Sequence, residues 1–186
     1  MRIFSKDREQ VIIQLFHRGD ASAMDELYAE YADYLSGVCY RYITDDDDLK
    51  DVLQESFIRI FTQISQFEYH GKGSLRAWVT RVTVNECLQL LRKQKKATVF
   101  NLDVEPPDIP EEDPDTEGLT GDTLTHLIRQ LPSGYRTVLN LFVIEEKSHK
   151  EIAEIMGIKP DTSASQYHRA KNMLARLIKE YIQQQQ

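Results

Sequence analysis

An acidic, proline-rich stretch near the middle of the chain limits what this sequence can fold into. Residues 97–120, ATVFNLDVEPPDIPEEDPDTEGLT, contain eight Asp and Glu, no Lys or Arg, and four of the six prolines of the chain. Proline removes backbone hydrogen-bond donors and like charges repel, so we expect an extended linker here rather than part of a packed core. A chain of 186 residues is thereby divided into two small domains, residues 1–96 and 121–186.

The acidity of the chain belongs to this predicted linker. The whole sequence has a formal charge of −7, but residues 1–96 hold 14 Lys and Arg against 15 Asp and Glu, and residues 121–186 hold 9 against 7. Neither predicted domain is strongly acidic, so the net charge does not exclude a nucleic-acid partner.

The sequence also limits the class of protein. Cys39 and Cys87 are the only cysteines and form no CxxC pair, which is typical of buried thiols in a reducing cytoplasm. No apolar run approaches the roughly 18 residues of a membrane span, and the N-terminus has no signal-peptide pattern. The five histidines are scattered without an HExxH motif. We therefore expect a cytoplasmic protein without a metal or cofactor.

Apolar residues recur at helical spacing in both domains, and no sustained alternating strand pattern occurs. In residues 1–96 the pattern predicts four helices, with Asp20 and Ser74 as caps of the second and fourth. Two glycines interrupt the pattern at Gln66–Gly73, which is predicted to be a loop. The predicted fold class is all-α, with two helical domains joined by the acidic linker.

The end of the chain predicts a helix-turn-helix. Ser148-His-Lys-Glu151 is a capping box, Gly157 suits a left-handed helix end, and Pro160 suits the first position of the next helix. The early residues of a recognition helix meet base edges, so the candidate DNA contacts, expected mostly to point away from the core, are Thr162, Ser163, Ser165, Gln166 and Arg169. The plain alternative is a helical hairpin packed in a small bundle.

The acidic run DDDD, Asp45–Asp48, has two interpretations. Adjacent acids near a helix start favour the helix dipole and cap its amides, whereas calcium loops alternate their ligands around a glycine turn. We interpret the run as a helix cap rather than a metal site.

Three stretches together resemble bacterial extracytoplasmic-function (ECF) sigma factors of the sigma-70 family. They are DLKDVLQESFIRIF (Asp48–Phe61), SLRAWVTRVTVNECLQLLRK (Ser74–Lys93) and the helix pair. The resemblance covers nearly the whole chain. It implies a sigma region 2 domain at 1–96, the linker at 97–120 and a region 4 domain at 121–186. It also implies a non-enzymatic promoter-specificity subunit whose partners are core RNA polymerase, promoter DNA and an anti-sigma factor.

The resemblance assigns roles to three groups of residues. The polymerase clamp helices would contact Asp48, Asp51, Gln54 and Glu55. The unpaired strand of the minus-ten promoter element would be captured by Phe67, Tyr69, His70, Arg76, Arg81 and Asn85, with loop aromatics stacking on a base. The helix pair would bind the minus-thirty-five element as duplex.

The sequence departs from the family pattern at four positions. Many members have a basic residue where this chain has Val84, an acidic one where it has Gln89, and Lys or Arg where it has Ala164 and Gln166. Two alternatives therefore stay open: a stand-alone helix-turn-helix regulator of duplex DNA, and a decoy that binds polymerase without supporting transcription.

Overall fold

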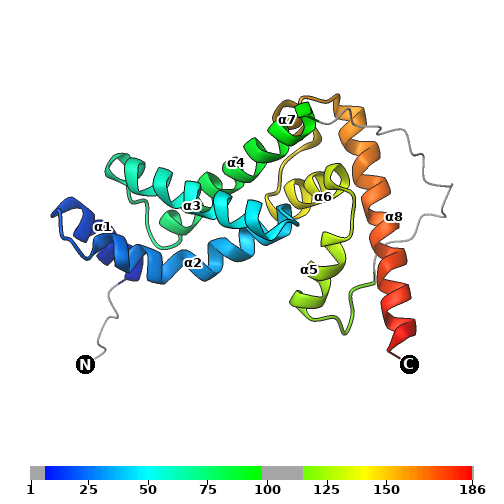
Figure 1. Ribbon diagram of the computed structural model, residues 1–186, viewed down its shortest axis with the longest axis horizontal. Helices are drawn as coiled ribbons and strands as arrows, with labels where there is room; N and C mark the ends of the chain where they lie inside the picture. Colours follow the sequence, from blue (N-terminus) through cyan, green and yellow to red (C-terminus); the bar gives the residue numbers. More distant parts are fainter. Residues whose placement is uncertain (1–6, 98–114, 186) are drawn as a thin grey trace. The chain divides into compact units, whose positions relative to one another are not determined.

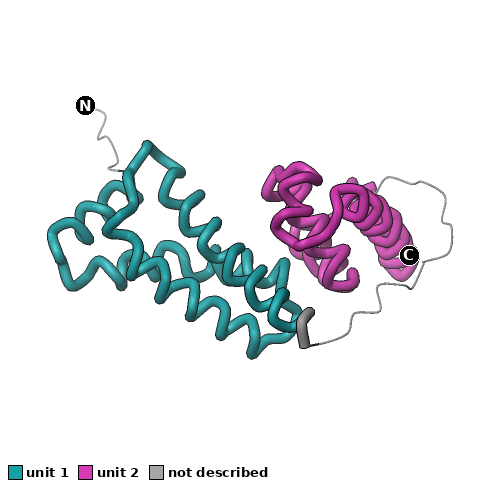
Figure 2. The backbone as a smooth tube through the Cα atoms, turned by 90° about the horizontal axis from the view of Figure 1, so that it is seen from above, with its two compact units in different colours: residues 1–94 teal, residues 95–186 magenta. Residues whose placement is uncertain are grey.

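The computed structural model describes residues 7–97 and 115–185, and within those ranges the chain forms helices and turns but no strand (Figure 1). The chain divides into two compact units, residues 1–94 and 95–186 (Figure 2). The all-α prediction is confirmed. Most of the predicted linker, residues 98–114, lies outside the described residues, so its boundaries stay a prediction.

The described part of unit 1 is built from α1 (Arg8–His17), α2 (Ala23–Tyr42), α3 (Asp46–Gln63), the short 3-10 turn η1 (Ile64–Gln66) and α4 (Ser74–Ala97). Helix α2 packs against both α1 and α3. The largest fully buried side chains come from all four helices and η1: Ile12, Leu27, Leu35, Tyr42, Ile60, Ile64 and Leu75.

The caps of unit 1 agree only partly with the predictions. The Asp45 carboxylate accepts hydrogen bonds from the amides of Asp47 and Asp48, so the acidic run does cap α3. Asp20 instead binds the amide and hydroxyl of Ser22, the residue that stands at the N-cap of α2. The predicted role of Asp20 as the cap was wrong, because its carboxylate closes the turn before the helix.

Unit 2 is built from α5 (Gly121–Arg129), α6 (Ser133–Leu139), the π-helical turn η2 (Asn140–Ile144), α7 (His149–Met156) and α8 (Pro160–Gln184). Helix α8 is packed against α5, α6 and α7. The core cluster joins α5, α6 and α8: Leu127, Ile128, Leu131, Tyr135, Leu139, Ala170, Leu174 and Ile178.

The predicted helix-turn-helix is present, with its local signals in place. The Ser148 amide donates to Glu151 Oε2 at 2.9 Å, and the Glu151 amide donates to Ser148 Oγ at 3.3 Å, which completes the capping box. Gly157 ends α7 with φ +65°, and Pro160 begins α8. These signals are local along the chain, which is why the sequence predicted them.

The π turn η2 was not predicted. It continues α6 and ends where the Glu145 amide donates to the carbonyl of Asn140 at 3.1 Å. Such turns are uncommon and widen the helix by one residue. Here the turn leaves Val143 and Ile144 exposed on unit 2. Within the described ranges, no helix is both long and apolar enough to cross a membrane.

Candidate nucleic-acid interface

One face of α3 is acidic and exposed. Asp48, Asp51 and Glu55 recur at spacings of three and four, so they share one side of the helix, with Gln54 beside them. Asp51, Gln54 and Glu55 are exposed, and the half-buried Asp48 accepts a hydrogen bond of 2.8 Å from Gln94 Nε2 of α4. This acidic face, defined by those four residues, suits a partner surface rich in Lys and Arg.

An ion pair behind the acidic face ties α3 to α4. Arg59 Nε lies 2.8 Å from Glu86 Oε1 and 3.6 Å from Glu55 Oε1. Glu86 is 6% exposed, and its burial raises the pKa of its carboxyl group, while the charge of Arg59 acts in the opposite direction. The pair therefore fixes the acidic face relative to the predicted DNA-capture helix.

The loop between η1 and α4 holds the three candidate minus-ten contacts that precede α4. The Phe67 ring packs on Trp78, with 5.2 Å between ring centroids. The Tyr69 hydroxyl donates to the carboxylate of Asp7, and this hydrogen bond is the main reason that the pKa of Tyr69 rises to about 12. His70 is exposed, and its backbone amide donates to Ser74 Oγ at 3.2 Å. Two of the three side chains are thus held by neighbours.

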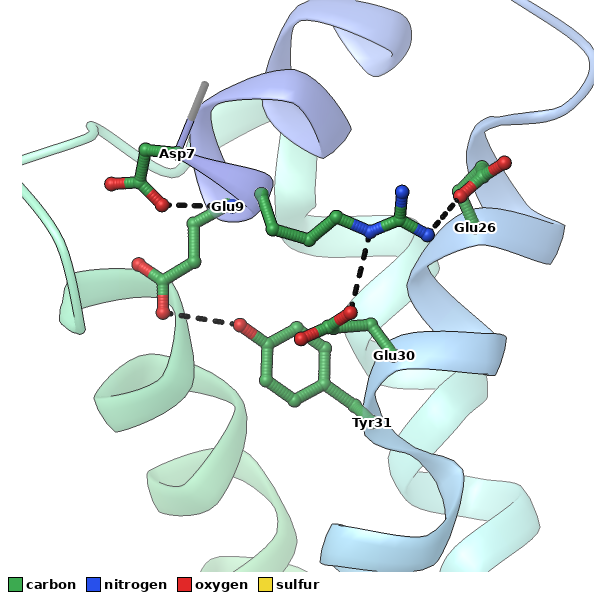
Figure 3. Close-up of polar contacts among 6 residues, drawn as sticks. Asp7, Glu9, Glu26, Glu30 and Tyr31 are labelled. Carbon is green, nitrogen blue, oxygen red and sulfur yellow. Dashed lines mark hydrogen bonds and ion pairs between the residues drawn. The ribbon is translucent and has the colours of Figure 1, made fainter. Parts of the chain in front are cut away.

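The amides at the start of α4 are bound by a carboxylate from α1. Glu9 is 8% exposed, and its two oxygens accept from the backbone amides of Gly73 (2.9 Å), Leu75 (3.2 Å) and Arg76 (3.2 Å). A fourth donor is the Tyr31 hydroxyl of α2 at 3.1 Å, the contact drawn in Figure 3. The cap predicted for Ser74 was wrong, because Glu9 binds these amides while the Ser74 hydroxyl binds His70.

The remaining minus-ten candidates lie on α4. The guanidinium carbon of Arg76 is 4.1 Å from the centroid of the Tyr34 ring, a cation–π contact that orients it. Arg81 and Asn85 are exposed and four residues apart, so they share one face. The structure brings these two together on the surface of α4, while Arg76 rests on α2.

Two of the five candidates on α8 face inward. Ser163 is fully buried with its Oγ 3.0 Å from His149 Nδ1, and Gln166 is 5% exposed. Both share the α8 face of the core residue Ala170, at helical spacings of three and four. The expectation that they point outward was wrong, and neither is retained as a DNA contact. Ser165 is exposed, and Thr162 and Arg169 are half-buried.

The outward face of α8 includes two residues that sequence analysis missed. His168 and Asn172 follow Ser165 at three and seven residues, and Arg169 follows it at four, so the four share one side of the helix. Asn172 Nδ2 lies 3.3 Å from His168 Nε2. Counting helical positions from Ser165 would have found both. We call Ser165, His168, Arg169 and Asn172 the outer face of α8.

Comparison with known proteins finds one family in both units. The model "Sigma-70 region 2" matches residues 27–97, and the model "Sigma-70, region 4" matches residues 122–174. The chain belongs to the sigma-70 family. Similar curated proteins place it among the ECF sigma factors.

Two relatives illustrate the similarity of this sigma factor to known ones. It is 30% identical over 164 residues to the ECF RNA polymerase sigma factor SigE of Mycolicibacterium smegmatis, covering 84% of this chain but only 63% of that protein's length. It is 28% identical over 189 residues to the ECF sigma factor SigW of Bacillus subtilis, covering 90% of this chain and 95% of the relative.

A solved structure agrees in fold. CnrH, in complex with the cytosolic domain of CnrY, matches with a TM-score of 0.51 at 20% identity, covering 94% of this chain and 99% of that one. At this identity the likeness supports the fold of the sigma factor.

The family match does not include every residue that shapes the candidate interface of the sigma factor. Asp7 and Glu9 precede residue 27, where the region 2 match begins. Among the four departures from the family pattern, Val84 and Gln166 are buried and Ala164 is exposed, while Gln89 donates to Glu86 at 3.1 Å. Val84 and Gln166 therefore do not form part of the candidate interface.

Proposed function

We propose that this sigma factor binds core RNA polymerase through the acidic face of α3 and directs it to a small set of promoters. One observation carries the proposal. The family models for region 2 and region 4 match the two compact units of one chain, and each unit has a candidate surface for binding polymerase or DNA. The four residues of the acidic face are exposed or half-buried and lie on one side of α3, which supports their role as clamp-helix contacts. The proposed domain assignment is 1–96 for region 2 and 121–186 for region 4.

In the proposed mechanism, the loop before α4 captures an unpaired base of the minus-ten element. Phe67, Tyr69 and His70 come from the loop, and Arg76, Arg81 and Asn85 supply charge and amide groups along α4. Aromatic stacking contributes about 1–3 kcal/mol per base, which offsets an unstacking cost of a few kcal/mol. DNA opening then needs no nucleotide hydrolysis. We propose a non-enzymatic, cytoplasmic factor that needs no cofactor.

The outer face of α8, with Thr162, is the proposed contact with the minus-thirty-five duplex. Arg169 is its basic group, and hydroxyl, imidazole and amide groups suit base edges and phosphates. Residues 121–186 carry only two more basic than acidic residues, so few phosphates can be neutralised. We expect weak binding by this unit alone, with affinity completed by the polymerase.

Regulation by an anti-sigma factor is part of the proposal. CnrH, which has the same fold, is seen bound to the cytosolic domain of CnrY. A partner that covers the acidic face of α3 would compete directly with polymerase for the same charges.

The test is run-off transcription with core RNA polymerase from the source bacterium, on fragmented genomic DNA, followed by sequencing of transcript starts. New starts that depend on this protein and share an upstream motif are the expected result. Binding to core without new starts would favour a decoy. Failure to bind core, with specific duplex binding, would favour a stand-alone regulator.

A further inference from the structure

Four donors occupy the acceptor positions of the Glu9 carboxylate, and three of them are backbone amides at the end of the loop and the start of α4. Oε1 accepts from the Tyr31 hydroxyl and the Arg76 amide, and Oε2 accepts from the amides of Gly73 and Leu75. A carboxylate has about four acceptor positions, so four donors satisfy it. A buried charge is tolerated when it is bonded in this way, and an anion suits the amides at a helix N-terminus. Glu9 therefore binds the backbone amides at the start of α4 and has no acceptor position left for another donor.

A second carboxylate of α1 binds the middle of the same loop. Asp7 accepts from the Tyr69 hydroxyl through Oδ2, while its Oδ1 caps the Glu9 amide at 3.1 Å. The beginning of α1 thus contacts both the aromatic part of the loop and its end at Gly73. Asp7 and Glu9 lie more than 60 residues before the loop in the chain.

The loop needs such contacts because its own backbone is permissive. Gly71 has φ +107° and Gly73 has φ +91°, values that L side chains rarely adopt. Two glycines so close together give the free loop many conformations, and a binding site that must order itself loses affinity. Contacts from α1 fix one conformation before DNA arrives.

We propose that Glu9, assisted by Asp7, is a positioning residue for capture of the minus-ten strand. This inference rests on the proposed function of the loop. Glu9 touches no DNA in this scheme; it acts by holding the amides of the loop end and of the first turn of α4. Loss of the Glu9 carboxylate leaves the amides of Gly73, Leu75 and Arg76 without this acceptor, and loss of the Asp7 carboxylate releases the Tyr69 hydroxyl.

The Tyr31 contact means that Glu9 also contributes to folding, so the test must separate stability from positioning. The polymerase holoenzyme is assembled with wild-type protein, Glu9→Gln, Asp7→Asn or the matched control Glu30→Gln. Glu30 is exposed on α2 and pairs with Arg8 at 3.3 Å, so its substitution makes the same chemical change near α1 without touching the loop. Each holoenzyme is titrated with a fluorescent single-stranded oligonucleotide of the non-template strand, taken from a promoter mapped by run-off transcription.

Glu9→Gln is expected to bind the oligonucleotide about tenfold more weakly, the worth of one hydrogen bond to a charged group, because an amide cannot accept at both positions. It should also lose discrimination against an oligonucleotide with a substituted minus-ten base. Affinity for core polymerase should stay at the wild-type value, and Glu30→Gln should match wild type throughout.

The outcomes separate this inference from the function on which it rests. If wild-type holoenzyme shows no sequence-dependent binding of the strand, the proposed function of the loop fails, and the inference fails with it. If wild type binds and both Glu9→Gln and Asp7→Asn bind equally well, only the positioning role is overturned. If Glu9→Gln does not fold, Asp7→Asn decides, because Asp7 is only half-buried at the N-cap of α1, where Asn caps as well as Asp. A loss of strand binding by Asp7→Asn with normal core binding then supports the proposal.

Discussion

Arg136 is a buried cation whose guanidinium group closes the end of a helix in unit 2. It is 4% exposed, and its Nη1 donates to the carbonyl oxygens of Arg129 at 2.8 Å and Leu131 at 3.0 Å, next to the end of α5. The last carbonyls of a helix have no partner within the helix and must be satisfied from elsewhere. Burial lowers the pKa of Arg136, so these hydrogen bonds offset a real desolvation cost.

Replacing Arg136 with Met should destabilise unit 2 by about 2–3 kcal/mol, because the buried carbonyl of Leu131 and the partly buried carbonyl of Arg129 lose this donor. Trp78 is the only tryptophan and lies in unit 1, so its fluorescence follows the unfolding of that unit, while circular dichroism follows both. The substitution should lower the urea midpoint of the dichroism change that belongs to unit 2. The midpoint measured by Trp78 fluorescence, which reports unit 1, should stay unchanged. Arg176→Met, at an exposed i,i+4 pair with Glu180, is the control and should change stability by less than about 1 kcal/mol. A shifted Trp78 midpoint would contradict the assignment of Arg136 to unit 2 alone.

Arg169 is the basic residue of the outer face of α8. We expect Arg169→Ala to weaken holoenzyme binding to a mapped promoter duplex by about 1–3 kcal/mol if Arg169 contacts a base. If it contacts a phosphate, the loss of affinity should be the same for every DNA sequence, and the slope of log K against log salt concentration should become shallower by about one. Competition binding at several salt concentrations distinguishes the two contacts. Lys179→Ala, ten residues further along α8, is the control, and equal affinities for all three proteins would remove Arg169 from the interface.

The candidate residues on α8 show what residue type can and cannot predict. Hydroxyl and amide groups suit DNA, which made Ser163 and Gln166 attractive candidates, yet their positions on the helix put them on the face of Ala170. The helical period of the sequence already places Ser163 and Gln166 in phase with Ala170. The phase of a residue on its helix, rather than its side-chain chemistry, decides whether it reaches DNA.

At the scale of elements, the capping box of α7 makes unit 2 sensitive to acid. The Ser148 amide and hydroxyl donate to the Glu151 carboxylate and hold the pKa of Glu151 below its usual value. A lowered folded-state pKa gives stability that is present above the unfolded value of 4.5 and is lost as the pH falls through the folded value. We expect the urea midpoint of unit 2, followed by circular dichroism, to fall when the pH is lowered below 4.5.

Glu151→Gln tests this origin of the acid response. The variant should be less stable than wild type at neutral pH, and the difference should shrink as the pH falls below 4.5, because wild type then loses the same charge. Urea unfolding at a series of pH values measures both effects. A constant difference at every pH would assign the acid response to other carboxyl groups. Ser148→Ala, which removes the hydroxyl, should cost about 1 kcal/mol at neutral pH.

The two best-defined helix starts differ in how far the sequence reveals them. The α7 cap joins residues three positions apart, so its pattern can be recognised in a short window. The α4 cap joins Glu9 to amides 64 to 67 residues away, and no local pattern connects them. The helices, the loop and the helix-turn-helix were therefore predictable, while the support of the loop by α1 required the tertiary structure. The π turn η2 likewise appears only in the structure.

For the molecule as a whole, the two units should unfold independently. The core cluster of unit 2 is made of residues of α5, α6 and α8 together with Leu131 between α5 and α6, and unit 1 has its own fully buried side chains. A fragment of residues 1–97 should therefore give the same Trp78 urea midpoint as the full chain. Fluorescence unfolding of both proteins in one buffer measures this directly. A lower midpoint for the fragment would mean that unit 2 stabilises unit 1.

The two native cysteines have a practical consequence for studying how this sigma factor works on polymerase. Cys39 and Cys87 are both fully buried in unit 1 and free of a disulfide, and the neighbouring Cys39, followed by burial, raises the pKa of the Cys87 thiol. Thiol reagents react with exposed thiolates, so neither cysteine should be modified in the folded protein. One cysteine introduced on the surface of each unit can then carry a fluorophore without removal of the native pair. Energy transfer between the two dyes would measure the separation of the units in the free protein and would follow its change when polymerase binds.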